Sequence, residues 1–128
     1  MKVLDTTFLI DLLRGDKNTL KIANSKDILL TTQINMYEVV RGLFLQSVSP
    51  SKMMRALELF ENIRVLPLDD SAVIKSAEIS ARLAKKGQII SDCDCLTAGI
   101  ALSNGVRKIV TRNIKHFRRI KDVDVEKY

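Results

Sequence analysis

Short apolar segments alternate with helical patterns along the whole of this 128-residue chain. The segments are three or four residues long, as buried strands often are, and helix-like segments separate them. The expected strands cover residues 2–4, 28–30, 63–66, 108–110 and, at the end of the chain, 123–125. This alternation predicts an α/β fold, with one domain over residues 1–128 built as a three-layer α/β/α sandwich around a mostly parallel central sheet.

Helix end signals support the same pattern. Ser49 and Pro50 suit the start of a helix that runs to about residue 61, because serine caps a helix and proline fits its first turn. Gly87 suits the left-handed end of a long helix that begins near residue 70. The other helices are expected at about residues 6–13, 17–23, 31–46 and 91–104.

Polar residues follow two of the expected strands directly. Asp5 comes after the first strand, and Thr111, Arg112 and Asn113 come after the fourth. Open α/β sheets bind ligands at the carboxyl ends of their strands, so these residues are candidates for a site. Simpler roles exist, because Asp5 could cap the helix that follows it and Asn113 could cap a turn.

The stretch SDCDCLTAGIA, residues 91–101, places Asp92 and Asp94 at the start of an otherwise apolar or small-residue segment. Ser91 and Asp94 form a variant of the capping box, and acids suit a helix N-terminus. Carboxylates there could also bind a metal ion. The two roles are compatible.

Glu38 lies in a segment, residues 34–45, that is apolar nearly all round, which predicts a buried helix. The polar exceptions Asn35, Glu38 and Arg41 are spaced by three residues and form one stripe. A buried acid needs a compensating cation or hydrogen bonds. Either Arg41 or a metal ion could supply the positive charge.

Three separated acids, Asp5, Glu38 and Asp94, are therefore expected to converge on one edge of the sheet. Carboxylates packed together repel one another, and a divalent cation relieves that repulsion. Hard oxygen ligands favour Mg²⁺ or Mn²⁺. Zinc is not predicted, because the chain offers only Cys93, Cys95 and one histidine as soft ligands.

The positive charge of the chain is concentrated near its end. The net charge is +6, and no acid occurs between Asp94 and Asp122. A solvated surface would explain such a run, but a one-sided excess also suits a polyanion such as RNA. The candidates for phosphate contacts are Arg112, Lys115, Arg118 and Arg119.

Taken together, the motifs resemble those of PIN-domain proteins, specifically VapC-type toxins of toxin–antitoxin pairs. The resemblance covers nearly the whole chain and rests on four stretches in the right order: MKVLDTTFLIDLL, MYEVVRG, ISDCDCLTAGIAL and IVTRNIKHF. It implies an α/β/α sandwich and a divalent-metal-dependent endoribonuclease, usually dimeric and inhibited by a cognate antitoxin. Carried over by position, Asp5, Glu38 and Asp94 form the acidic core, with Thr6 and Asn113 as supporting polar groups.

The sequence departs from the family pattern at two positions. His116 stands before Phe117, where the family often has a fourth acid, and Asp92 is an extra carboxylate. Asp92 could help to hold a second ion, or the site could bind one metal more weakly. His116 could touch RNA phosphate or have no role. The alternative function is a PIN-like module that binds RNA or protein without cutting.

The sequence also bears on location and partners. Asp5 and Asp11 interrupt any apolar leader at the N-terminus, so a cytoplasmic protein without a membrane anchor is expected. An antitoxin partner is expected to be acidic. The helices before Gly15 and after Ser49 are candidate surfaces for the antitoxin and for self-association as a homodimer.

Overall fold

The computed structural model describes all 128 residues, and its centre is a five-stranded sheet. The strands are β1 (Lys2–Leu4), β2 (Leu29–Thr32), β3 (Arg64–Leu66), β4 (Lys108–Val110) and β5 (Asp124–Glu126). Their order is β3-β2-β1-β4-β5, and every neighbouring pair is parallel. The predicted α/β sandwich is confirmed, and the sheet is wholly rather than mostly parallel.

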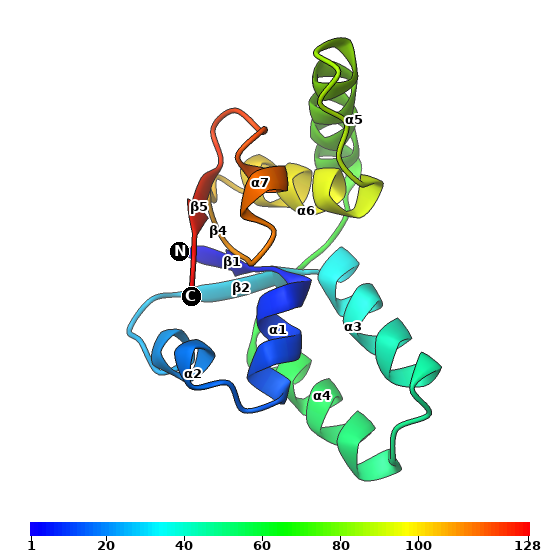
Figure 1. Cartoon of the computed structure of the whole chain (residues 1–128), viewed down its shortest axis with the longest axis vertical. Helices are drawn as coiled ribbons and strands as arrows, with labels where there is room; N and C mark the ends of the chain where they lie inside the picture. The colour runs from blue at the N-terminus through cyan, green and yellow to red at the C-terminus, as the bar shows by residue number, and fades with distance from the viewer.

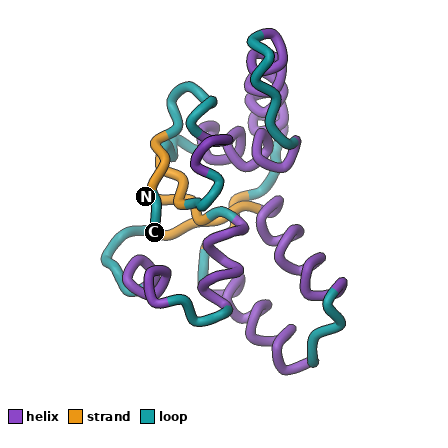
Figure 2. Tube along the Cα trace, in the orientation of Figure 1, coloured by secondary structure: helices purple, strands orange, loops and turns teal.

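Seven helices cover the two faces of the sheet (Figure 1). One face carries α1 (Thr6–Leu13), α2 (Lys17–Ala23), α3 (Gln33–Leu45) and α4 (Pro50–Asn62); the other carries α5 (Asp70–Lys85), α6 (Asp92–Ser103) and α7 (Ile114–Phe117). Figure 2 shows the strands as a thin layer between these helical groups. No helix of the chain combines the length and the apolar character needed to cross a bilayer.

Alternate residues of each strand serve the two separate cores. Val3 and Ile109 pack with α5 and α6, whereas their neighbours Leu4 and Val110 pack with α1 and α3. Side chains of a strand point alternately to the two faces, so a three-residue strand suffices to bind both layers together. This double packing fixes the register of β1 against β4, in which Leu4 lies opposite Val110.

Most predicted boundaries hold to within one or two residues. The main shift is in β2, which begins at Leu29 rather than Ile28 and takes in Thr31 and Thr32. Thr32 still caps α3, because its hydroxyl accepts a hydrogen bond from the backbone N–H of Asn35. Gly87 has a φ of 66° just after α5, as its predicted role requires.

The prediction that the helix over residues 34–45 is buried all round is wrong. Only Asn35 and Val39 of α3 are buried, while Tyr37, Phe44 and Leu45 are 60%, 70% and 67% exposed. The reason is that α3 packs one side against α1, α4 and α6, and nothing in the chain covers its other side.

Candidate active site

The strand order brings the two ends of the chain together at one edge of the sheet. Since β1 and β4 are neighbours, Asp5 and Thr111 both emerge directly after paired strands. The backbone N–H of Asp5 continues the ladder by donating to the carbonyl of Val110 over 3.0 Å. The polar residues that follow these strands therefore meet, as the sequence predicted.

Asp5 is buried among neutral hydrogen-bond donors. Its carboxylate is 2% exposed, accepts a hydrogen bond from Asn35 Nδ2 on Oδ1 at 3.0 Å, and accepts one from Thr111 Oγ1 on Oδ2 at 2.7 Å. Asp5 occupies the N-cap position of α1, but its side chain makes no capping hydrogen bond there. The simpler reading, in which this carboxylate serves as a helix cap, is not realised.

The electrostatic setting of Asp5 shows which acids are near it. The pKa of Asp5 is raised from 3.8 to about 6, mainly by burial and to a smaller extent by the charges of Asp94 and Glu38. The hydrogen bond from Thr111, and a weaker one from the backbone of Thr6, oppose this rise. Glu38 of α3 and Asp94 of α6 thus lie close enough to Asp5, which follows β1, for their charges to affect it.

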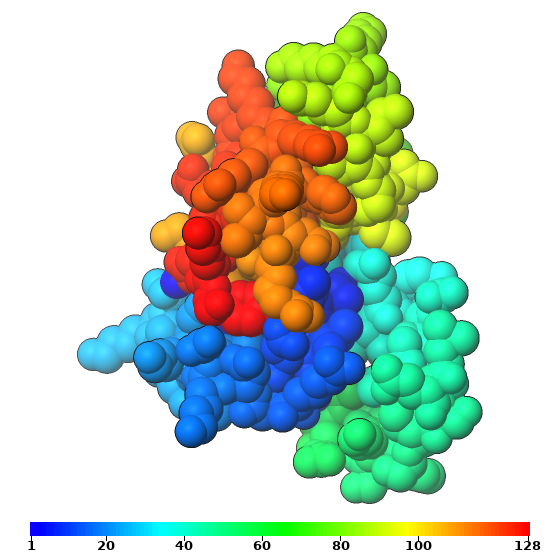
Figure 3. Space-filling model, viewed as in Figure 1, coloured from blue at the N-terminus to red at the C-terminus, as the bar shows by residue number.

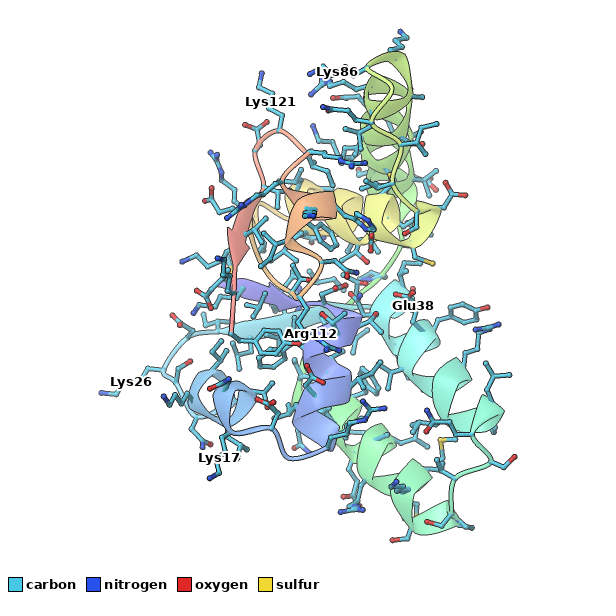
Figure 4. The ribbon with its side chains drawn as sticks, in the orientation of Figure 1. Lys17, Lys26, Glu38, Lys86, Arg112 and Lys121 are labelled. Atoms are coloured by element: carbon cyan, nitrogen blue, oxygen red, sulfur yellow. The ribbon has the colours of Figure 1, made fainter.

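Glu38 is half-buried and turned toward the start of α1. Thr6 Oγ1 donates a 2.7 Å hydrogen bond to Glu38 Oε1, and the thiol of Cys93 also interacts with the Glu38 carboxylate, which raises the pKa of Cys93. Arg41 is exposed and forms no ion pair with Glu38, so it does not supply the charge considered above. Figure 4 shows Glu38 on the first half of α3, where that helix comes closest to α1 and α6.

Asn35 is a site residue that the sequence interpretation did not identify. It is fully buried, and its Nδ2 lies within hydrogen-bond distance of Asp5, Thr6 and Thr97. Its place three residues before Glu38, on the same stripe of α3, was the available signal. Asn35 thus joins the start of α1, including its N-cap Asp5, to α6.

Asp94 is buried at the first turn of α6, where only 7% of the residue is exposed. Its backbone N–H donates to Ser91 Oγ, so the cap forms without using the Asp94 carboxylate. That carboxylate instead meets His116, whose Nδ1 lies 3.0 Å from Oδ2. Asp92 is exposed, since two positions along a helix separate side chains by about 200°. It is not among the charges that raise the pKa of Asp5.

The supporting residues differ in what they contact. Thr7 Oγ1 accepts from the backbone N–H of Arg112 at 3.0 Å, and Thr111 Oγ1 accepts from that of Asn113 at 2.9 Å. The side chain of Asn113 is half-buried and forms no hydrogen bond. These contacts tie the turn after β4 to the first turn of α1.

The donor chemistry of this site fits a hard divalent cation. No lysine or arginine pairs with Asp5, Glu38 or Asp94, although the chain carries a net charge of +6. No three His, Cys, Asp or Glu side chains lie together in a group that could hold a metal ion by itself. Mg²⁺ does not need one, because it keeps several waters and uses one or two carboxylates.

The nearby thiol does not change this conclusion. Burial raises the pKa of Cys93, and the charges of Glu38 and Asp94 raise it further, so the group stays a neutral thiol near pH 7. The carboxylate oxygens that surround this thiol are hard ligands, which suit Mg²⁺ or Mn²⁺.

The predicted phosphate-binding residues lie on or beside α7. Lys115 and Arg118 are exposed, and Arg119 is anchored by a 3.1 Å hydrogen bond to the carbonyl of Ile89. Arg112 pairs with Asp11 at 3.0 Å while its side chain stays 58% exposed. In Figure 3 the orange segment that contains α7 lies at the front of the molecule, above the blue N-terminal segment.

Comparisons with known proteins agree with this architecture. The PIN domain family model matches residues 2–123. The tRNA(fMet)-specific endonuclease VapC of Salmonella typhimurium is 32% identical over 96 residues, covering 74% of this chain and 71% of that protein. Ribonuclease VapC1 of Methanocaldococcus jannaschii is 28% identical over 127 residues, covering 98% of this chain and 85% of that protein.

Solved structures show the same fold. A chain of VapBC-1 from nontypeable Haemophilus influenzae superposes with a TM-score of 0.82 at 27% identity, covering 98% of this chain and 96% of that one. A chain of VapBC2 from Rickettsia felis, solved with a promoter DNA fragment, reaches a TM-score of 0.85 at 21% identity, with 99% and 98% coverage. With the family model spanning nearly all of its residues, the chain belongs to the PIN domain family.

Proposed function

We propose that this chain is an endoribonuclease that depends on a divalent metal ion, Mg²⁺ or Mn²⁺, and is the toxin of a toxin–antitoxin pair. Curated relatives named as VapC ribonucleases support the reaction class. The observation that carries the proposal is the grouping of Asp5, Glu38 and Asp94 at one edge of the sheet without a lysine or arginine partner.

Asp5 and Asp94 would hold the ion, because they are the two buried carboxylates of the site. An ion bound there supplies a more acidic water and neutralises charge on the phosphate under attack. Glu38 would orient the attacking water, and the hydrogen bond from Thr6 to its Oε1 fixes its carboxylate for this role. Asn35 and Thr111 hold the carboxylate of Asp5 in place.

RNA would approach across α7. Lys115 and Arg118 are exposed on or next to the helix that carries His116, the residue that contacts Asp94. Arg112 precedes that helix and is anchored by Asp11, and Arg119 follows it and is anchored by the carbonyl of Ile89. Contacts of this kind bind phosphates without reading the base sequence.

The deciding experiment compares acid-to-amide variants in RNA cleavage and metal binding. Asp5→Asn and Asp94→Asn should abolish cleavage of tRNA in Mn²⁺, and each should weaken Mn²⁺ uptake measured by calorimetry. Asp92→Asn is the matched control, because Asp92 lies two residues from Asp94 but is exposed, and it should retain activity. Parent-level cleavage by Asp5→Asn would refute the assignment.

The second candidate is a PIN-like module that binds RNA or protein without cutting. It is favoured by the absence of a closed group of three ligands and by the contact of His116 with Asp94. Calorimetry separates the two candidates. A nuclease of the proposed kind takes up Mn²⁺ and cleaves, whereas the module binds RNA with unchanged affinity in EDTA.

An acidic antitoxin would bind the groove between α1, α3 and α4. The two helices that the sequence singled out, before Gly15 and after Ser49, both line it. Its lining combines apolar and basic side chains, which include Ile10, Leu13, Val39, Leu43, Arg14, Lys52 and Arg55. The VapBC complexes among the structural relatives support such a partner. Reversal of charge at Arg14 and Arg55 should weaken binding of the antitoxin without changing RNA cleavage.

A homodimer is proposed on the other side of α3. Tyr37, Phe44 and Leu45 are exposed there and line a second apolar groove with Met36, Val40 and Leu57. Exposed apolar side chains that are contiguous mark an association surface. Phe44→Glu should shift the mass measured by light scattering from dimer to monomer. The proposed compartment is the cytoplasm, where such a dimer would meet RNA.

A further inference from the structure

His116 makes a specific contact at the point where this sequence departs from its family. It lies on α7, and its Nδ1 is 3.0 Å from Oδ2 of Asp94, although 22 positions separate the two residues. The backbone that carries the ring is held in place, because the next residue, Phe117, is fully buried. The contact is therefore built into the packing of α7 against α6.

The contact gives the two carboxylate oxygens of Asp94 different surroundings. Oδ2 meets the imidazole, while Oδ1 forms no hydrogen bond within the chain. The side chain of Asp94 is only 10% exposed and that of His116 is 48% exposed. An imidazole N–H at this distance restricts rotation of the carboxylate and leaves one oxygen available.

We propose that His116 is a positioning residue that fixes the carboxylate of Asp94 through its Nδ1–H, so that the free Oδ1 can bind a divalent cation. The inference rests on the proposed function, because it assigns Asp94 to the metal. A fourth acid would add negative charge beside Asp94, whereas the imidazole adds a hydrogen-bond donor. Outer partners of metal ligands typically change metal affinity by about 10–100-fold when they are removed.

The geometry requires one form of the ring. When the imidazole is neutral, its proton must be on Nδ1, because the Asp94 oxygen can only accept. Nε2 then carries no proton. In the chain this can be tested without ambiguity, because His116 is the single histidine.

The first test measures Mn²⁺ binding by calorimetry to untagged protein carrying alanine, asparagine or glutamine at position 116. Asparagine places an amide N–H as many bonds from Cβ as Nδ1, whereas glutamine matches the more distant Nε2. We expect His116→Ala and His116→Gln to bind Mn²⁺ about 10-fold more weakly or worse. His116→Asn should stay within about 3-fold of the parent, by the same argument.

The second test needs no metal. Nitrogen NMR of the imidazole in EDTA, at a pH where the ring is neutral, should show the proton on Nδ1. Asp94→Asn should shift the population toward the Nε2–H form, which free histidine favours. A parent ring protonated on Nε2 would overturn the proposal, because the donor to Asp94 would be missing.

The outcomes separate the two proposals. If the parent binds Mn²⁺ and His116→Ala binds it equally well, the positioning role is refuted while the nuclease assignment stands. Equal rescue by asparagine and glutamine would also refute it, since the position of the donor would not matter. If the parent takes up no Mn²⁺, the metal-dependent nuclease and the role of His116 in it both fall.

Discussion

The hydroxyl group of Thr111 donates a 2.7 Å hydrogen bond to Oδ2 of Asp5, across 106 positions of sequence. The two residues meet because Leu4 and Val110, which precede them, are paired in neighbouring parallel strands. This hydrogen bond lowers the pKa of Asp5 and so partly opposes the effect of its burial. It links the last third of the chain to the carboxylate of the first acid of the site.

Thr111→Val should weaken metal binding by raising the pKa of Asp5 above its present value of about 6. A metal ligand must be deprotonated, so Mn²⁺ affinity in the parent should fall as the pH drops through about 6, and in the variant at a higher pH. Calorimetry across roughly pH 5 to 8, which includes the pKa of about 6, measures the pH midpoint of Mn²⁺ binding for the parent and for the variant. Thr31→Val is the control, because that buried hydroxyl donates to the carbonyl of Leu4 instead. An identical midpoint in parent and Thr111→Val would contradict the prediction.

Asp5→Asn should stabilise the metal-free protein above pH 6. The folded pKa of Asp5 is raised, so ionisation destabilises the fold progressively between 3.8 and about 6, and the penalty is complete above that range. The shift corresponds to at most about 3 kcal/mol. Urea unfolding in EDTA should show Asp5→Asn more stable than the parent near neutral pH, with the difference shrinking toward the lower end of the range. If Asp5→Asn is less stable than the parent both near neutral pH and at the lower end of the range, ionisation of Asp5 does not destabilise the fold.

Gly99→Ala should destabilise the protein, whereas Gly42→Ala should not. A Cβ added at Gly99 would collide with Ser76 of α5, whose Cα would lie 2.8 Å away, so the packed helices α5 and α6 would have to separate. Overpacking of this kind typically costs about 1–3 kcal/mol. Gly42 also lies in a helix, but nothing is within 4 Å of its added Cβ, so alanine should raise stability by about 0.5–1 kcal/mol. Thermal unfolding of both variants tests the contrast, and equal effects would refute it.

Tyr128→Phe should cost about 1–2 kcal/mol of stability. The Tyr128 hydroxyl donates a 2.6 Å hydrogen bond to Asp11, which also pairs with Arg112, so its loss loosens the turn beside the site. The edge-to-face contact with Phe8, at a centroid distance of 5.0 Å, is retained in the variant. Tyr37→Phe is the matched control, because Tyr37 is 60% exposed and should change stability by less than about 0.5 kcal/mol. Unfolding in urea distinguishes them.

Strand alternation and helix caps predicted most of the fold because both are local properties of the chain. Asp5 was recognisable because an acid directly after a buried strand has a defined place in a parallel sheet. Asn35 was not, since its three partners come from elements distant in sequence. Helix α7 was missed because four residues are too few to show helical periodicity, and with it the contact of His116 was missed.

The exposed side of α3 was mispredicted for a different reason. Apolar residues all round a helix indicate that the helix is buried, but they do not show whether its own chain or a partner covers it. Phe44 and Leu45 are covered by nothing in this chain, so their sequence pattern indicates a partner as readily as a core. The metal, RNA and phosphate roles assigned to individual residues remain predictions.

The central place of β1 in the sheet has a consequence for how the protein comes into being. β1 is synthesised before every other strand, yet one of its partners is β4. Thr111, which donates a hydrogen bond to Asp5, lies 106 residues later in the chain. A growing polypeptide on the ribosome therefore carries its first acid long before the groups that complete the cluster. The set of Asp5, Glu38, Asp94 and Thr111 is therefore complete only after most of the chain has been synthesised.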